Sequence, residues 1–255
     1  MFEVIRVFVL RDLIIRYRHT VLGLLWLLIR PVVISGGIVF LLYQLSQGQA
    51  MQMPLKELIA FILVGLLPWN YLAAAASEGS ASFLENHHLL NKVYFSRASL
   101  PIAKASVCFL DFLGSLLLLI VFSILFPEVF TIGPRLLLLP LIALLLFAFG
   151  CAIATLLSIL ILRFADLRHL VPFIVQFGIF ISPIGFRSSA FLEGWSWIIA
   201  WNPATFFIES FRWSILANYS LEPQILMTSF FSASFLSGLS VVLYRANRFK
   251  LAEWL

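Results

Sequence analysis

Six long apolar runs constrain this 255-residue chain more than any other feature of its sequence. A helix that crosses the hydrocarbon layer of a membrane needs about 20 mostly apolar residues. The runs that reach or approach this length lie at about 21–45, 58–76, 101–126, 136–162, 170–186 and 225–244. Hydrophobic residues make up 62% of the chain and charged residues 11%, against roughly 45–50% and about 25% in soluble domains. The sequence therefore predicts an all-α integral membrane protein, with six transmembrane helices in one domain over residues 21–244.

Lysine and arginine are distributed unevenly over the segments between these runs. With a cytoplasmic N-terminus, twelve of the 17 cations fall on the cytoplasmic side and four on the other side, while Arg30 lies inside the first run. Cytoplasmic segments of membrane proteins carry the excess of Lys and Arg. The count predicts that both termini are cytoplasmic, with residues 245–255 as a tail. The first 20 residues lack the cleavage site of a signal peptide, so we expect them in the mature protein.

Residues 1–20 are expected to form a cytoplasmic helix at the membrane surface, although their apolar side chains do not gather on one clean face. The arginines in this segment are Arg6, Arg11, Arg16 and Arg18. Each charged side chain at the centre of a bilayer costs at least about 2.5 kcal/mol, so the segment does not cross the membrane. The cations suit the anionic lipids of the cytoplasmic leaflet instead.

The polar segment Glu78–Pro101 is the longest on the predicted cytoplasmic side. Its helical part is expected at Ser82–Asn91, where Phe83, Leu84 and Leu90 give one apolar strip and Glu85, Asn86 and His88 point elsewhere. Such a helix either lies on the lipid headgroups or docks onto a soluble partner.

A second unusual segment, Arg187–Leu221, lies between the fifth and sixth runs. Its tryptophans are Trp195, Trp197, Trp201 and Trp213, and Asn202-Pro203 interrupts it. Tryptophan prefers the boundary between membrane and water, which predicts interfacial or half-inserted helices. Alternatively, the segment re-enters the membrane at Asn202-Pro203 and closes the outer mouth of a conduit.

The sequence carries little catalytic chemistry. None of its four lysines belongs to a G-x-x-x-x-G-K-[ST] phosphate loop, and no hydrolase motif is present, so we expect no enzyme activity in this chain. His87 and His88 are adjacent, hence about 100° apart on a helix, and His19 and His169 are isolated, so no metal site is expected. The net charge of +5 is explained by membrane topology, and we expect no binding of nucleic acid.

Two ionisable residues inside the apolar runs are functional candidates because charge is expensive there. Asp111 follows Lys104 by seven residues, which places both on one helix face and predicts a pair between them. Arg30 lies a turn or two from the inner boundary, where its side chain can reach the headgroups, or it faces a conduit.

Five groups of residues distributed over nearly the whole chain carry a resemblance to a known family. They are Arg11-Asp12, Arg16-Tyr17-Arg18, Leu22-Gly23, Leu25-Trp26 and Pro31; Gly65–Trp69; Leu90–Phe95 with Arg97 and Leu100-Pro101; Arg163–Arg168; and Pro183 with Asn202-Pro203, Glu209 and Arg212-Trp213. In this combination the chain resembles the membrane subunits of polysaccharide-exporting ABC transporters of the type-2 permease family, the O-antigen and teichoic-acid exporters. Arg30 departs from the pattern, because the family usually has an uncharged residue before this proline.

The resemblance implies a permease subunit of the bacterial inner membrane. It implies a homodimer that recruits two copies of a separate nucleotide-binding ATPase subunit, which holds the ATP and Mg²⁺, and a lipid-linked polysaccharide as the substrate. It also implies an interface helix at Met1–Thr20, outer gate helices at Ala190–Ala217 and a coupling helix at Ser82–Lys92. The coupling residues would be Phe83, Leu84, Glu85, Asn86, His87, Leu90 and Lys92.

On this interpretation the cations of residues 1–20 meet the pyrophosphate of the lipid carrier, and aromatic rings in the conduit offer flat faces to sugars. Arg30, Trp195, Trp197, Trp201 and Trp213 are the candidates for the conduit or gate. Two alternatives remain: a type-2 ABC permease for a drug or lipid, and a secondary transporter or channel. The second is disfavoured, since the sequence has no internal inverted repeat and no set of buried acids for ion coupling.

Overall fold

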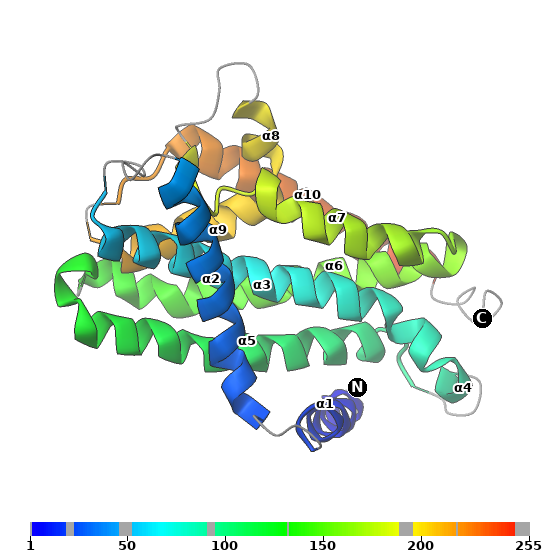
Figure 1. Ribbon diagram of the computed structural model, residues 1–255. Coiled ribbons are helices and arrows are strands. Elements are labelled where there is room, and N and C mark those ends of the chain that lie inside the picture. The colour runs from blue at the N-terminus through cyan, green and yellow to red at the C-terminus, as the bar shows by residue number, and fades with distance from the viewer. Residues whose placement is uncertain are drawn as a thin grey trace.

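The chain folds into a bundle of α-helices (Figure 1). The computed structural model describes residues 2–18, 23–45, 53–90, 95–131, 133–188, 196–217 and 219–247. Within these residues the helices are α1 (Phe2–Tyr17), α2 (Trp26–Leu45), α3 (Leu55–Glu85), α4 (His87–Leu90), α5 (Ser99–Leu125), α6 (Leu139–Arg163), α7 (Leu167–Ile181), α8 (Ser196–Trp201), α9 (Pro203–Ile215) and α10 (Pro223–Asn247). Short 3-10 helices, η1 (Gly23–Leu25), η3 (Pro127–Val129) and η4 (Pro134–Leu138), precede α2 and connect α5 to α6.

Helix α3 is the centre of the bundle. It packs against α5 and α6, and it also contacts α2, α7 and α9. Most of its residues between Leu58 and Phe83 are buried, whereas the other long helices keep broad apolar faces exposed, as lipid-facing helices do. Its 31 residues span about 46 Å, which exceeds the hydrocarbon thickness of about 30 Å. About ten of them therefore extend beyond the hydrocarbon.

A small residue allows α6 to approach this central helix closely. Tyr71 of α3 is buried, and its hydroxyl donates a hydrogen bond to the carbonyl oxygen of Phe147 over 3.2 Å. The ring lies directly against Gly150 of α6, where any Cβ would overlap it. Small residues at contacts between membrane helices allow this kind of approach. The position of Tyr71 thus depends on a glycine at 150.

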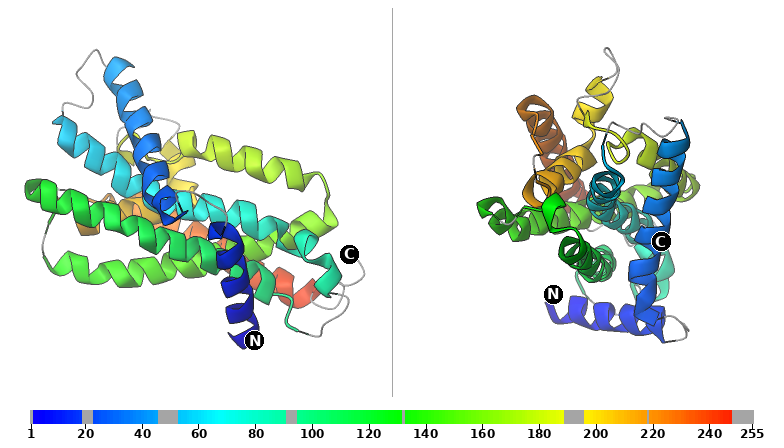
Figure 2. Two further views of the ribbon diagram at one scale, coloured as in Figure 1. Left: turned by 60° about the horizontal axis from the view of Figure 1, so that its bottom comes forward. Right: turned by 60° about the vertical axis from the view of Figure 1, so that its left-hand side comes forward.

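Helices α1 and α2 lie across the bundle, not along it. Figures 1 and 2 show that both helices run at a steep angle to the common direction of α3, α5, α6 and α10. Helix α2 contacts α3 and α5 but buries only Pro31, Ser35 and Val39. Most of the surface of α2 is therefore open to lipid or to another protein.

The two ends of the bundle differ in how they are held together. At the end that we name the α4 end, Phe83, Leu100 and Ile159 form a small buried cluster, against which Phe8 and Tyr244 pack. This cluster joins α1, α3, α5, α6 and α10. At the opposite end, the α9 end, residues 129–131 pair with residues 215–217 through two backbone hydrogen bonds of 2.9 and 3.0 Å.

Arg212 of α9 holds an irregular part of the chain in place. Its side chain is fully buried, and it donates to the carbonyl oxygens of Pro183 (2.5 Å), Ile184 (2.6 Å) and Phe61 (3.2 Å). Its guanidinium also lies 3.5 Å from the ring centroid of Phe61 and 3.4 Å from Glu209. A Cβ at position 65 would lie 2.6 Å from the guanidinium, so a larger residue there would force Arg212 to move. Arg212 therefore supplies donors to carbonyls that follow the end of α7 and have no helical partner.

The structure confirms the all-helical class and places helices at each of the six predicted runs. Among the described residues, five helices are long and apolar enough to cross a membrane: the ones that include α2, α3, α5, α6 and α10. The fifth predicted run, 170–186, is the exception, because α7 ends at Ile181 after 15 residues. A helix of that length spans about 22 Å. It is too short to cross alone, and the chain continues as turns through Gly185.

The boundaries predicted for the polar segment were wrong. Residues 82–91 do not form one separate helix: Ser82–Glu85 is the last turn of α3, and α4 is a single turn after Asn86. The amide of Asn86 donates to the carbonyl oxygen of Ser82 over 2.9 Å and is buried at this break. Between α7 and α10 the chain forms α8 and α9, with the side chain of Asn202 accepting from the backbone of Ala204 at the start of α9.

We expect the change Arg212→Met to destabilise the protein strongly. It removes the donors of three buried carbonyls and the counter-charge of Glu209, and breaking a buried pair on one side costs about 3–5 kcal/mol. The apparent melting temperature of the detergent-solubilised protein measures this loss. Arg168→Met, at an exposed position, is the matched control and should leave the melting temperature unchanged. Equal melting temperatures for the two variants would contradict the role given to Arg212.

Candidate functional site

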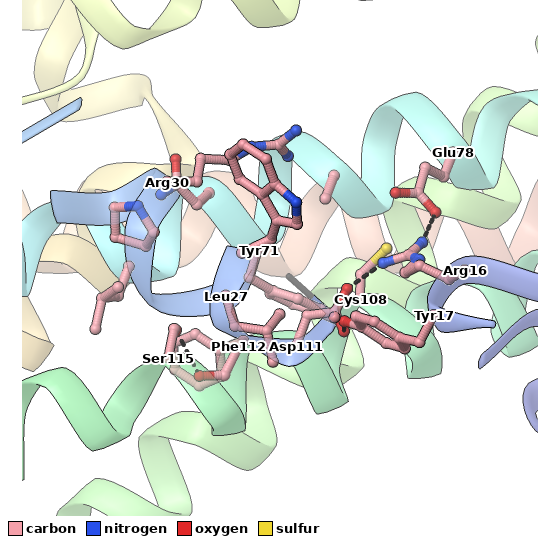
Figure 3. A pocket seen from close by; sticks show the side chains of 16 residues that line it. Arg16, Tyr17, Leu27, Arg30, Tyr71, Glu78, Cys108, Asp111, Phe112 and Ser115 are labelled. Atoms are coloured by element: carbon pink, nitrogen blue, oxygen red, sulfur yellow. Dashed lines mark hydrogen bonds and ion pairs between the residues drawn. The ribbon is translucent and has the colours of Figure 1, made fainter. Parts of the chain in front are cut away.

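A network of charged side chains joins α1 to the bundle near the α4 end (Figure 3). Arg16 forms ion pairs with Glu78 of α3 and Asp111 of α5. The hydroxyl of the neighbouring Tyr17 donates to the other carboxylate oxygen of Asp111 over 2.5 Å. One turn of α1 therefore reaches two helices of the bundle.

The electrostatics of this network keep its members in fixed protonation states. Burial by itself would lower the pKa of Arg16, but the carboxylates of Glu78 and Asp111 raise it above the ordinary value. Burial raises the pKa of Tyr17, and the hydrogen bond to Asp111 raises it further. At neutral pH Arg16 is charged and Tyr17 carries its proton, so both remain donors to the acids.

A second network lies beside the first and includes the end of α3. Lys104 of α5 pairs with Glu85, the last residue of α3, over 3.1 Å and with Asp12 of α1 over 3.3 Å. Asp12 also pairs with Arg11 over 2.8 Å. The predicted pair between Lys104 and Asp111 was wrong, because each finds partners on other helices. Lys104 thus connects the end of α3, next to α4, with α1.

A cavity of about 360 Å³ opens next to the first network, between α1, α2, α3 and α5. Its lining includes Arg16, Trp26, Arg30, Asn70 and Tyr71 together with both acids of the network. Figure 3 shows that Arg30 lies away from Arg16 and Glu78, toward the opposite end of the cavity. The cavity combines charged, aromatic and amide groups, which suits it to binding a polar ligand.

The residues predicted to couple to an ATPase fall into two groups. Phe83 is buried in the cluster at the α4 end, and so it does not offer an apolar strip to a partner. Asn86 is also buried, while Glu85, His87 and His88 are exposed. Leu84 is half-buried, Leu90 ends α4, and Lys92 lies outside the described residues. Among residues 82–88, whose burial the structure describes, the exposed ones are therefore polar.

The four N-terminal arginines are not equivalent. Arg6 and Arg18 are exposed on α1 and on the residue that follows it. Arg11 is half-buried and paired with Asp12, and Arg16 is engaged by two acids. Only Arg6 and Arg18 thus present a whole guanidinium to a ligand or membrane surface.

The predicted conduit or gate residues do not come together in one place. Trp197 and Trp201 are exposed on α8, and Trp201 lies 6.4 Å from the ring of Phe231. Trp213 is half-buried on α9, with the guanidinium of Arg135 over its ring at 5.1 Å. Trp195 lies outside the described residues, and Arg30 lines the cavity beside α1. Helix α9 is buried along most of its length, so it is part of the bundle and not an interfacial belt.

Sequence reasoning missed several residues that build the site. The sequence did not reveal that Glu78, Asp12 and Tyr17 take part in the two networks. Tyr17 does stand between two candidate site residues in the Arg16-Tyr17-Arg18 motif. Arg212 and Gly65 belonged to noted motifs, but nothing in the sequence revealed that they touch. Within the described part of the chain, no three His, Cys, Asp or Glu side chains are grouped as a metal site requires.

Comparison with known proteins places this architecture in a family. Residues 3–216 match the ABC-2 type transporter family. Two O-antigen export system permease proteins RfbA of Klebsiella pneumoniae are each 28% identical over 258 residues, covering 99% of this chain and 95% of each relative. An O-antigen export system permease protein RfbA of Myxococcus xanthus is 27% identical over 204 residues, covering 79% of this chain and 76% of the relative. Since the family match takes in most of the chain and the bundle has several membrane-spanning helices, this multi-pass membrane protein belongs to the ABC-2 type transporter family.

Proposed function

We propose that this chain is the permease subunit of an ATP-driven exporter that moves a lipid-linked polysaccharide across the bacterial inner membrane. The observation that carries the proposal is the similarity, over 99% of the chain, to proteins named as O-antigen export permeases. Nucleotide hydrolysis is assigned to a separate ATPase subunit, because the sequence has no phosphate loop.

The proposed topology has six crossings with the α4 end in the cytoplasm. Helix α7 would complete the fifth crossing together with the turns at Ser182–Gly185, since irregular backbone is tolerated at membrane depth where protein satisfies its polar groups. Arg212 supplies such partners at Pro183 and Ile184. The excess of cations on the segments of the α4 end supports this orientation.

Coupling is proposed to act through α3. The exposed residues Glu85, His87 and His88 lie where this helix leaves the membrane domain, which is where an ATPase subunit would dock. The same helix is continuous to Gly65 and Phe61, which contact Arg212 near the α9 end. A displacement of its cytoplasmic end would therefore be transmitted to α9, the proposed gate, without passing through a loop.

The conduit is proposed to form between two copies of this chain. Helix α2 buries only three of its residues within one copy, and α7 buries only Val171. A second copy that covers these helices would enclose the space between them, as the family resemblance implies. The polymer would pass there and its lipid carrier would remain in the membrane.

Export in cells tests the proposal as a whole. Cells in which the gene for this chain is deleted should lose their surface polysaccharide and accumulate the lipid-linked polymer inside, and the intact gene should restore it. The chain expressed without its ATPase subunit is the control and should not restore export. Unchanged surface polysaccharide in the deletion strain would contradict the substrate proposed here, and transport by the chain alone would contradict the need for an ATPase.

The change Lys104→Gln should uncouple ATP hydrolysis from export. It removes both the pair with Glu85 at the docking end of α3 and the pair with Asp12 of α1. Changes at residues that link two sites alter their coupling by about 0.5–2 kcal/mol, so export per ATP hydrolysed should fall about 2- to 30-fold. The measurement compares both rates in the reconstituted complex. Lys104→Arg keeps the charge and should retain most of the coupling, and an identical loss in both variants would show that charge is not what matters.

The exposed arginines and Arg16 should give different defects. The double change Arg6→Gln and Arg18→Gln should weaken binding of the pyrophosphate-bearing carrier by about ten-fold without lowering the melting temperature, as loss of charged hydrogen bonds to a ligand does. Arg16→Gln should lower the free energy of unfolding by about 1–2 kcal/mol, because Glu78 and Asp111 lose their counter-charge in a partly exposed site. Carrier binding and thermal melting of the purified complexes distinguish the two. Normal carrier binding in the double variant would show that the carrier does not bind at α1.

A further inference from the structure

The cavity beside α1 holds a cation, Arg30, that makes no ion pair with any residue the structure describes. Of its two arginines, Arg16 is bound by Glu78 and Asp111, whereas no ion pair or hydrogen bond among the described residues includes Arg30. Arg30 lies on α2 with its side chain exposed. Ionisable residues in membrane-spanning helices are expensive and usually paired, so an unpaired one calls for a partner.

A second group in the same cavity also lacks a partner. The amide nitrogen Nδ2 of Asn70, on α3, is buried and makes no hydrogen bond with any described residue. Nearly all buried donors in proteins are satisfied, and leaving one unsatisfied costs about 1–3 kcal/mol. Arg30 and Asn70 thus both present donors without a described acceptor, and an occupant rich in acceptors would satisfy both.

The two acids of the cavity, Glu78 and Asp111, equal its two arginines in number, but neither makes an ion pair with Arg30. Glu78 and Asp111 are both engaged by Arg16, and Asp111 also accepts from Tyr17. Figure 3 shows Arg30 separated from Arg16 and Glu78 along the cavity. The carboxylates therefore lie at one end of the cavity with Arg16 and Tyr17, and at the other end the guanidinium of Arg30 has donors without a described acceptor.

The position of Arg30 indicates what kind of anion can reach it. It follows Trp26 by four residues, about 6 Å along α2, and tryptophan is enriched at the level of the headgroups. Farther along the same helix Val32 and Val33 are exposed and apolar. A ligand with its charge at Arg30 can therefore place an alkyl chain against α2. Phosphate carried on a lipid meets these requirements, since it offers only acceptors at neutral pH and binds arginine through two parallel hydrogen bonds.

We propose that Arg30 and Asn70 form a subsite for the phosphate of a lipid phosphate ester. The phosphate would accept hydrogen bonds from the guanidinium of Arg30 and from Nδ2 of Asn70, with Trp26 as an apolar wall. The source is either the carrier of the exported polymer or the headgroup of a membrane phospholipid. The first source rests on the proposed function, whereas the subsite itself does not.

Direct binding to the purified complex with its ATPase subunit, without nucleotide, tests the subsite. The probe is radiolabelled farnesyl diphosphate, a short prenyl phosphate ester, and farnesol is the matched compound without phosphate. We expect farnesyl diphosphate to bind and farnesol to bind at least about ten-fold more weakly. Arg30→Gln and Asn70→Leu should each weaken binding of farnesyl diphosphate, by about ten-fold or more for Arg30→Gln. Arg168→Gln, at an exposed position outside the cavity, should bind as the unchanged protein does.

Competition and melting curves complete the design. If vesicles of phosphatidylglycerol displace the probe at equal phosphate concentration, the subsite takes phospholipid headgroups; if they do not, it takes the prenyl carrier. Equal binding of farnesol, or binding by Arg30→Gln within two-fold of the unchanged protein, would overturn the subsite. Melting temperatures of all variants verify that they are folded, and Arg30→Lys should recover part of the affinity. Because the assay contains no transport step, a failure of export would leave its result intact.

Discussion

Backbone carbonyls that no helix satisfies are the constraint on which the arrangement of this bundle depends. In hydrocarbon each unpaired polar group costs several kcal/mol, so a helix that ends early within a membrane needs donors from elsewhere. Helix α7 ends at Ile181, and Arg212 donates to the carbonyls of Pro183 and Ile184 that follow it. Burying an arginine for this purpose requires space beside α3, which Gly65 provides. The end of α7, the position of α9 and the sequence of α3 are therefore determined together.

The contact between Arg212 and α3 also links two distant parts of the bundle. Its cytoplasm-facing end in the proposed topology is bound by Lys104, and its other half is bound by Arg212. A helix is stiffer along its length than a loop because its residues are held by backbone hydrogen bonds, and in α3 Pro68 is the one described residue between Phe61 and Glu85 without a backbone N–H to donate. Movement of one end therefore displaces the contacts at the other. In this chain the proposed docking region and α9 both pack on α3, so in the proposed mechanism this one helix connects them.

Much of the fold could be predicted from the sequence, because long apolar runs are strongly constrained by the thickness of the membrane. Helices α5, α6 and α10, predicted at 101–126, 136–162 and 225–244, begin and end within a few residues of the prediction. The errors arose where membrane boundary and helix boundary differ. Helix α3 continues past residue 76 to Glu85, since Ser, Gly and Glu lower hydropathy without ending a helix. Helix α7 stops inside an apolar run because Ser182 precedes Pro183, and a proline disfavours the helical conformation in the residue before it.

The site was harder to predict than the fold, because one residue type serves three purposes in it. Arg16, Arg30 and Arg212 look alike in sequence, and only the acids and carbonyls brought near them distinguish their roles. Arg16 meets carboxylates 62 and 95 residues away, so it fixes α1 and has little charge left for a ligand. Arg212 donates its hydrogen bonds to backbone carbonyls. Arg30 alone lies in a cavity without a described partner. An arginine that acids contact directly contributes to stability, and one that no described acid contacts has donors left for an anion. By this reasoning the proposed phosphate subsite lies at the position that departs from the family pattern, Arg30, whereas Arg16 of the N-terminal cluster is engaged by acids of the bundle.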